Sequence, residues 1–276
     1  MYRAAGLLSV AVTTGPSYTL AELVAVQCAE VWRGQGEVLA TSFGIPPRIG
    51  AGLARLTFNP DLLMTDGEAY LLAEPVPLGP RAASDARVEG WVPFSRIFDL
   101  LWHGRRHALL GPVQVDRYAQ MNISVIGDYA RPKAAILGAR GLPGNSISHI
   151  NSMYVPNHST RVFVAGEVDM VCSAGFNPDR WPEGRVPDSL RIGKVVTDLA
   201  VLDFGGLNHA PRLLSVHPGV NAEQVQAATG FKLERGADVP VTRAPTQVEL
   251  SIIRERLDPH DLRATVFKGN PPGDRR

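Results

Sequence analysis

Residues 133–148 of the chain read KAAILGARGLPGNSIS. The apolar run at 134–137 leads into a loop with Gly138, Gly141 and Gly144, and then into a polar segment. This order predicts a buried strand, a glycine-rich turn and a further element, which is a frequent layout of α/β sites. Glycine adopts positive φ at little cost and lets backbone N–H groups approach a phosphate, a carboxylate or an oxyanion. The G-x-x-G-x-x-G spacing is neither the dinucleotide fingerprint nor a Walker loop, so a plain strand-to-helix connection remains the alternative.

The composition around this stretch is that of a globular protein. The chain has 276 residues, of which 45% are hydrophobic and 20% charged, enough to bury a sizeable core. A formal net charge of +1 gives no indication of a nucleic-acid-binding surface. Cys28 and Cys172 lie far apart in apolar stretches, and no zinc-ligand spacing is present. We therefore expect two buried thiols in a reducing, cytoplasmic compartment, with no bound metal and no nucleic-acid partner.

The N-terminal residues 1–18 are interpreted separately. Residues 4–12 form an apolar run after Arg3, about as long as the apolar part of a signal peptide. They are followed by TTGPS rather than by a small-x-small cleavage site. We expect a short leader or edge segment, with export as the alternative. No stretch approaches the roughly 20 apolar residues that span a bilayer, so no membrane association is expected.

The sequence that follows predicts a strand–helix–strand unit. Thr19 and Glu22 have the spacing of a capping box, and a helical stripe of apolar residues comes after them. Residues 38–43 read as a buried strand, a helix begins at Pro46-Pro47, and residues 62–65 read as the next strand. This order implies a parallel crossover, and hence an α/β sheet with helices on both faces.

The rest of the chain continues the alternation in one domain, residues 19–260, followed by a polar tail, 261–276. We expect a helix at 93–101, strands at 108–115, 123–126, 194–204 and 213–216, and helices at 222–229 and from the capping box at 246–249 to residue 257. No internal repeat or linker interrupts this series.

Several short motifs occur in the order seen in β subunits of family I CoA-transferases, and the chain most resembles the glutaconate type. The motifs are QVDRY (114–118), NISVIGD (122–128), the glycine loop, VTDL (196–199), DF (203–204), VHPG (216–219), TG (229–230) and RERLDP (254–259). No single motif is decisive, but the ordered set is specific and covers residues 19–259. The resemblance implies a Rossmann-like α/β subunit that works beside a homologous α subunit, on a CoA thioester bound between them.

The resemblance also identifies two departures from the transferase pattern. In true transferases the glutamate of a Glu-Asn-Gly or Glu-Gly-Gly turn attacks the thioester. The matching position in this chain is Thr65, flanked by Asp66 and Glu68. A threonine hydroxyl is a poor nucleophile without an adjacent base. The family's Asp-Arg-Tyr-Gly-Asn pattern ends in Ala119 and Gln120 instead.

These departures are similar to those of the steroid-ring-opening members of the superfamily, the IpdAB type. The resemblance then implies hydrolysis of a carbon–carbon bond in a cyclic CoA thioester from cholesterol ring degradation, in a retro-Claisen sense. The essential carboxylate would come from the α subunit, in an α2β2 heterotetramer. Coenzyme A would be part of the substrate, and no permanently bound cofactor is expected.

Two groups of residues are candidates for the site. Backbone N–H groups of the glycine loop are expected to hold the thioester or an enolate oxygen. The loop residues are Gly138, Ala139, Arg140, Gly141 and Leu142. The expected pocket-lining residues are Thr65, Asp66, Asn145 and His149. For His149, a packing role competes with that of a proton carrier, because no acidic residue is near it in sequence.

Two other functions remain open on the sequence. The chain could be a true CoA-transferase subunit, with Asp66 or Glu68 as the acyl carrier after a one-residue shift of register. It could also be a non-catalytic scaffold that only completes the fold of its partner. Substrate identity and stoichiometry are not encoded in any readable motif.

Overall fold

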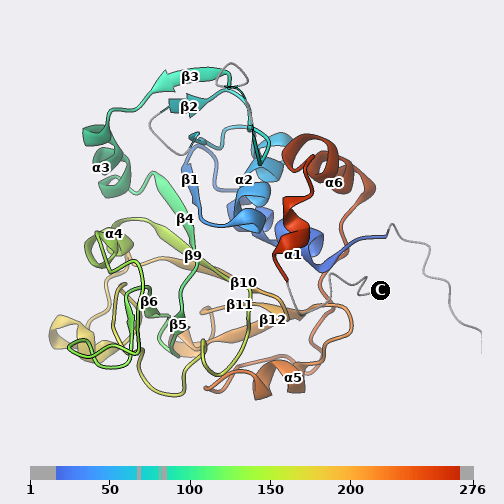
Figure 1. Ribbon diagram of the computed structural model, residues 1–276. Coiled ribbons are helices and arrows are strands. Elements are labelled where there is room, and N and C mark those ends of the chain that lie inside the picture. Colours follow the sequence, from blue (N-terminus) through green and yellow to red (C-terminus); the bar gives the residue numbers. More distant parts are fainter. Residues whose placement is uncertain (1–16, 67–69, 81, 83–85, 268–276) are drawn as a thin grey trace, which may run out of the picture.

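The computed structural model describes residues 17–66, 70–80, 82 and 86–267. Its centre is a six-stranded sheet with the strand order β1-β4-β9-β10-β11-β12 (Figure 1). The strands are β1 (Leu39–Ser42), β4 (Arg106–Leu110), β9 (Ile150–Val155), β10 (Ile192–Thr197), β11 (Ala200–Asp203) and β12 (Arg212–Val216). β1, β4, β9 and β10 run parallel, and β11 is antiparallel to both β10 and β12. The mostly parallel α/β sheet predicted from the sequence is confirmed.

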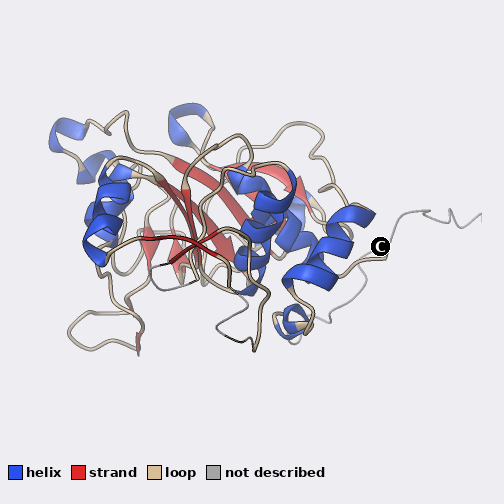
Figure 2. Ribbon diagram, turned by 90° about the horizontal axis from the view of Figure 1, so that it is seen from above, coloured by secondary structure: helices blue, strands red, loops and turns tan. Residues whose placement is uncertain are grey.

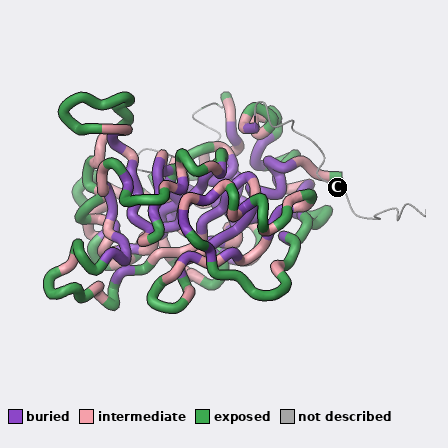
Figure 3. Tube along the Cα trace, turned by 90° about the horizontal axis from the view of Figure 1, so that it is seen from below, coloured by how far each residue is buried: buried purple, intermediate pink, exposed green. Residues whose placement is uncertain are grey.

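Helices pack against this sheet, as Figure 2 shows from above. The α-helices are α1 (Leu20–Ala29), α2 (Ile45–Thr57), α3 (Phe94–Trp102), α4 (Leu142–Ser148), α5 (Ala222–Ala227) and α6 (Gln247–Ser251). A π-helical segment, η6 (Ile252–Leu257), continues α6, and η7 (Leu262–Thr265) is a 3-10 turn. Two buried clusters result, one containing α1 and α2 and the other containing Val225 of α5. Figure 3 shows the buried backbone at the centre and exposed loops around it.

The helix α1 is buried on all sides. Its capping box forms as predicted: the Glu22 amide donates to Thr19 Oγ1 at 3.3 Å, and the Thr19 amide donates to Glu22 Oε2 at 2.8 Å. The axes of α1 and α2 approach closely at Gly50, where a Cβ would lie 2.7 Å from Cys28 Cβ. Helices that are apolar all round are interior helices, so α1 is the centre of the first core.

The predicted strand at residues 62–65 was wrong in extent. Leu63 forms a single parallel bridge to Leu39 of β1, so the crossover through α2 does return beside β1. Two residues later Thr65 already bridges antiparallel to Leu71 in β2 (Tyr70–Leu72). The chain therefore turns back too early for a strand to form there.

The predictions for residues 108–137 were also partly wrong. The strand expected at 108–115 ends with β4, and the strand expected at 123–126 is limited to its last two residues, within a series of short hairpins. These are β5 (Gln114–Val115) with β6 (Met121–Asn122), and β7 (Val125–Ile126) with β8 (Ala134–Ala135); β2 pairs likewise with β3 (Val88–Trp91). The apolar run at 134–137 is not a buried strand, since β8 is exposed and Leu137 is 69% exposed.

The sequence analysis missed β9, the strand between β4 and β10. Its polar residues explain the omission, because Asn151 and Ser152 are buried and interrupt the apolar pattern. Both have partners inside the protein: Asn151 Nδ2 donates to the Ser146 carbonyl at 2.9 Å, and Ser152 Oγ lies 2.8 Å from His107 Nε2, although Asn151 Oδ1 is buried without a partner among the described residues. Buried polar groups paired in this way are invisible to periodicity.

Ordered packing extends past residue 260. Phe267 is buried in the first core, and Arg263 donates to Glu22 at 3.2 Å. The boundaries of the single domain and of its two end segments stay predictions, and residues 1–16 and 268–276 lie outside the described residues.

The described ranges contain neither a membrane-spanning helix nor a cluster of metal ligands. None of the helices there is long and apolar enough to cross a membrane. Nor do three or more His, Cys, Asp or Glu side chains in this part of the chain converge in a way that could hold a metal ion.

Candidate functional site

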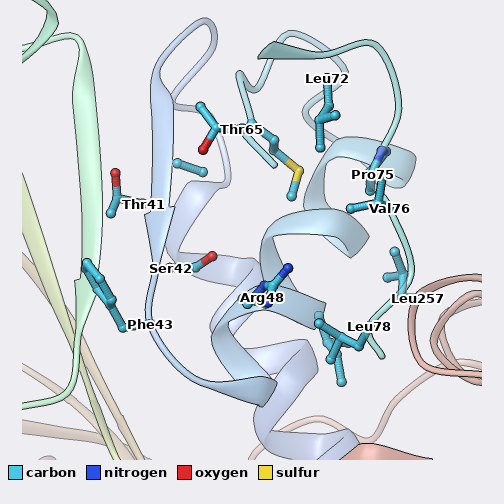
Figure 4. A pocket seen from close by; sticks show the side chains of 13 residues that line it. Thr41, Ser42, Phe43, Arg48, Thr65, Leu72, Pro75, Val76, Leu78 and Leu257 are labelled. Atoms are coloured by element: carbon cyan, nitrogen blue, oxygen red, sulfur yellow. The ribbon is translucent and has the colours of Figure 1, made fainter. Parts of the chain in front are cut away.

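A cavity of about 240 Å³ lies where β1 ends and α2 begins. Its wall is formed by the end of β1, the first turns of α2, the connection after β2, and the residues Met64, Thr65 and Leu257. Figure 4 shows Ser42 and Arg48 on one side of the β1 ribbon, with Thr41 and Phe43 on the other. The cavity thus combines hydroxyl groups and one guanidinium group with an apolar wall.

The turn at Gly44 sets this geometry. Gly44 has φ +104° and is the N-cap of α2, a conformation in which a side chain would be strained. Pro46 and Pro47 occupy the first helical turn, where their missing N–H groups have no intrahelical acceptor to lose. The strand end and the first turn of α2 therefore face the same space, which places Ser42 and Arg48 at it.

Thr65, which the resemblance places at the position of the family's glutamate, is among the residues that line this cavity. It is half-buried and starts a reversal in which the Asp66 amide donates to the Tyr70 carbonyl at 3.2 Å. Asp66 is half-buried as well but does not contribute to the wall. Glu68, the other flanking carboxylate, lies outside the described residues.

The cavity wall lacks a general base among the residues that the structure describes. None of the lining side chains is Asp, Glu, His or Cys. Serine and threonine hydroxyls become nucleophiles when an adjacent base takes the proton, and an acyl-anhydride needs a carboxylate. The described wall thus offers hydroxyl and guanidinium donors but no group that would activate a nucleophile.

The glycine loop does not share this cavity. None of residues 138–142 is in its wall. Gly138 and Arg140 have positive φ, +81° and +51°, and the loop leads into α4, where the Asn145 amide donates to the Gly141 carbonyl at 2.9 Å. Arg140 is exposed and Asn145 half-buried. The structure therefore does not bring the two predicted groups together in one pocket, and an oxyanion role for the loop stays a prediction.

His149 is buried beside the N-terminal residue of β4. Its Nδ1 lies 3.1 Å from the Ile150 carbonyl, and its Nε2 lies 3.5 Å from Nη1 of Arg106. Burial, and then the nearby positive charge of Arg106, lower the pKa of His149 to about 4. A histidine that is neutral at pH 7 and buried in this way suits packing better than proton transfer, the weighting favoured from the sequence.

Arg106 connects His149 to β1. Its Nε donates to Thr41 Oγ1 at 2.8 Å, and Thr41 belongs to the cavity wall. Arg106, Thr41, Ser42 and Arg48 were not predicted as site residues from the sequence. A signal existed for Ser42 and Arg48, because Gly44 followed by Pro46-Pro47 marks a strand end that passes directly into a helix.

Comparisons with known proteins give close relatives over nearly the whole chain, although no protein-family model matches. The chain is 44% identical over 245 residues to the cholesterol ring-cleaving hydrolase IpdB subunit of Rhodococcus jostii (strain RHA1), covering 89% of this chain and 94% of that protein. The crystal structure of IpdAB from the same strain superposes with a TM-score of 0.82, at 42% identity, over 91% of this chain and 99% of that chain.

A more distant structure has the same fold. Glutaconate coenzyme A-transferase from Acidaminococcus fermentans superposes with a TM-score of 0.74, at 26% identity, over 91% of this chain and 97% of that chain. The α/β fold of the CoA-transferases, predicted from the ordered motifs, is thereby confirmed.

Proposed function

Since the chain belongs to the IpdB family of cholesterol ring-cleaving hydrolase subunits within the CoA-transferase superfamily, we propose that it is the β subunit of a heteromeric enzyme that opens a ring of a cyclic CoA thioester. The enzyme hydrolyses a carbon–carbon bond in a cholesterol-derived ring remnant. Its partner is a homologous α subunit, as the pairing in IpdAB suggests, and the proposed assembly is α2β2.

The observation that carries the mechanism is the composition of the cavity wall. Ser42, Arg48 and Thr65 contribute polar groups, while a base is lacking among the described lining residues. A hydrolase whose carboxylate comes from the α subunit fits this composition, because that carboxylate can deprotonate a water held between the two chains. Thr65 then binds substrate where a transferase would carry its acyl group.

The proposed reaction is a retro-Claisen cleavage. The water oxygen, on losing a proton to the partner's carboxylate, bonds to a ring ketone carbon. The bond from that carbon to its neighbour breaks, and the electron pair becomes an enolate on the adjacent carbonyl group. Protonation of the enolate carbon then leaves a ring-opened carboxylic acid that still carries CoA.

This chain stabilises the negative oxygens of that sequence. The guanidinium of Arg48 and the hydroxyls of Ser42 and Thr65 are suited to a carbonyl oxygen that becomes negative. The backbone of residues 138–142 remains a second proposed group of donors, toward the thioester or pantetheine, with Asn145 and His149 beside it. Asp66 is proposed to hold the turn that presents Thr65. A cytoplasmic location stays a prediction.

The test is made on the complex co-purified with its native α subunit. A ring-derived β-keto CoA thioester is incubated in H₂¹⁸O, with and without acetate or succinate, and products are followed by mass spectrometry. We expect a ring-opened CoA thioester with one ¹⁸O atom in its new carboxylate, formed at the same rate with or without the acid. Formation of acetyl-CoA or succinyl-CoA would contradict the proposal and favour the transferase alternative, with Asp66 or Glu68 as acyl carrier.

A loop variant separates the enzyme subunit from the scaffold. Shortening residues 138–142 should lower the rate of ring opening in an intact complex if the loop contributes donors. Full activity in a complex with the shortened loop would favour the scaffold alternative for this region.

A further inference from the structure

Arg106 is a half-buried cation whose hydrogen bonds within the described residues all go to neutral groups. Its Nε donates to the Thr41 hydroxyl at 2.8 Å, and its Nη1 faces the His149 ring at 3.5 Å. Within the described ranges no Asp or Glu forms an ion pair with Arg106, whereas its sequence neighbour Arg105 pairs with Glu37 at 2.9 Å. Removal from water lowers the pKa of Arg106 to about 10, so the group is still charged at neutral pH.

The groups around Arg106 add positive charge and supply no negative charge among the described residues. His149 has its pKa lowered to about 4, by burial and then by Arg106, and Arg191 contributes a further positive charge to this site. A charge withdrawn from water is costly unless it is paired. A guanidinium also presents a planar fork of donors that matches a carboxylate, and here Nη2 has no hydrogen bond among the described residues.

We propose that Arg106 is a carboxylate-binding residue, held in place by Thr41 and His149, and that its carboxylate is supplied from outside this chain. Thr41 belongs to the wall of the candidate cavity, and its side chain lies on the far side of β1 from Arg48 (Figure 4). The bound carboxylate therefore lies next to the cavity but across β1 from it. Two cationic subsites, Arg48 and Arg106, then flank the same strand.

The inference rests on the proposed function for the origin of the carboxylate. Two sources have the required chemistry: an acidic side chain of the α subunit, and a carboxylate of the substrate or of the ring-opened product. The shared chemistry is a charge-assisted, forked hydrogen bond to Arg106, which accounts for a cation that this chain leaves unpaired in its described part.

The test uses the co-purified complex with three variants of this chain. Arg106→Gln removes the charge, Arg106→Lys keeps the charge without the fork, and Arg105→Gln is the matched control at the adjacent exposed position. Subunit dissociation is measured without ligand, and binding of the ring-opened CoA thioester is measured by calorimetry on the assembled complex. Thermal unfolding of each complex is recorded in parallel.

A charge-assisted hydrogen bond contributes about 1.5 to 3 kcal/mol, which corresponds to roughly a 10- to 140-fold change in an equilibrium constant. We expect Arg106→Gln to weaken one of the two equilibria by that factor, Arg106→Lys to restore part of it, and Arg105→Gln to change neither by more than about twofold. Weaker assembly without ligand identifies the carboxylate as the partner's. Weaker thioester binding by an intact complex identifies it as the ligand's.

Two results would overturn the inference. One is Arg106→Gln leaving both equilibria unchanged, including the case in which only the unfolding temperature falls, which would mean a purely structural role. The other is that Glu68→Gln weakens the same equilibrium as Arg106→Gln, and that the variant carrying both substitutions is no weaker than either alone. This result would place the carboxylate within this chain. Both equilibria can be measured even if the wild-type complex opens no ring, so failure of the proposed function is seen separately.

Discussion

Two clusters of charged side chains in this molecule are built in opposite ways. In the helix α1, Glu22 is 1% exposed and accepts hydrogen bonds from Arg254 at 2.7 Å and from Arg263 at 3.2 Å. At the start of β4, Arg106 meets only a hydroxyl and a neutral imidazole. The first cluster is complete within the chain and joins α1 to residues 254–263, whereas the second lacks an anion in the described residues. The difference separates charges that hold the fold from a charge kept for a ligand or partner.

The largest expected effect comes from breaking the complete cluster. Glu22→Ala leaves Arg254 and Arg263 without their shared carboxylate and removes the capping box of α1. We expect a loss of about 3 kcal/mol in unfolding free energy, because half of a buried ion pair is left uncompensated. The check is a fall in the unfolding midpoint of the complex on heating. A change in unfolding free energy below about 0.5 kcal/mol would show that this cluster is not needed to stabilise the fold.

The next effect is the acid dependence of the paired carboxylates. Burial acts to raise the pKa of Glu30, but hydrogen bonds from Arg33 and Arg243 outweigh it and lower the pKa to about 2. The net pKa shifts of Glu22 and Glu249 are also downward, with arginine hydrogen bonds outweighing burial. Because the folded values lie below the unfolded value near 4.5, their stabilisation is present above that pH and is lost as pH falls toward 2. Unfolding midpoints measured from pH 5 to pH 2 should drop steeply in this window.

A third prediction concerns the incomplete cluster. The folded pKa of His149, about 4, lies below its ordinary value of 6.5, so its neutral form is favoured in the fold. Stability from this group is present above pH 6.5 and is lost as pH falls from 6.5 to 4, a higher window than that of the carboxylates. His149→Gln should reduce the change in unfolding free energy between pH 6.5 and 4 by about 1 kcal/mol. A curve parallel to the wild type between pH 6.5 and 4 would contradict the assignment.

The smallest effect is expected at an exposed ion pair. Arg87 and Glu74 are joined at 2.6 Å but are 73% and 50% exposed. Solvent screens such pairs, so Arg87→Ala should change the unfolding free energy by less than about 0.5 kcal/mol. This variant is the baseline against which the Glu22→Ala loss is compared.

Local sequence signals were reliable where the structure itself is local. The capping boxes predicted at Thr19 and Thr246 both form, because each depends on side chains three residues apart. The helix that begins near Pro46 was also predicted, as were the strands β1 and β12, and the ordered motifs identified the CoA-transferase fold. That Thr65 occupies the position of the family's nucleophile stays a prediction.

The errors occurred where a run of residues has more than one possible environment. Residues 134–137 are apolar but exposed on a hairpin arm, and β9 is buried but contains Asn151 and Ser152. An apolar run in the sequence does not reveal whether it is buried in the folded chain. A polar residue whose hydrogen bonds are made inside the protein is not recognised from the sequence as a core residue.

The sequence by itself determined the fold class, the starts of the helices with predicted capping boxes, and the family, because these follow from short-range periodicity and from motif order. Only the tertiary structure decided that Ser42 and Arg48 share a cavity with Thr65, that the glycine loop does not, and that Arg106 has no acidic neighbour in the described chain. The physical reason is that cavities and ion pairs join residues from separate strands and helices, and packing alone fixes which of them meet.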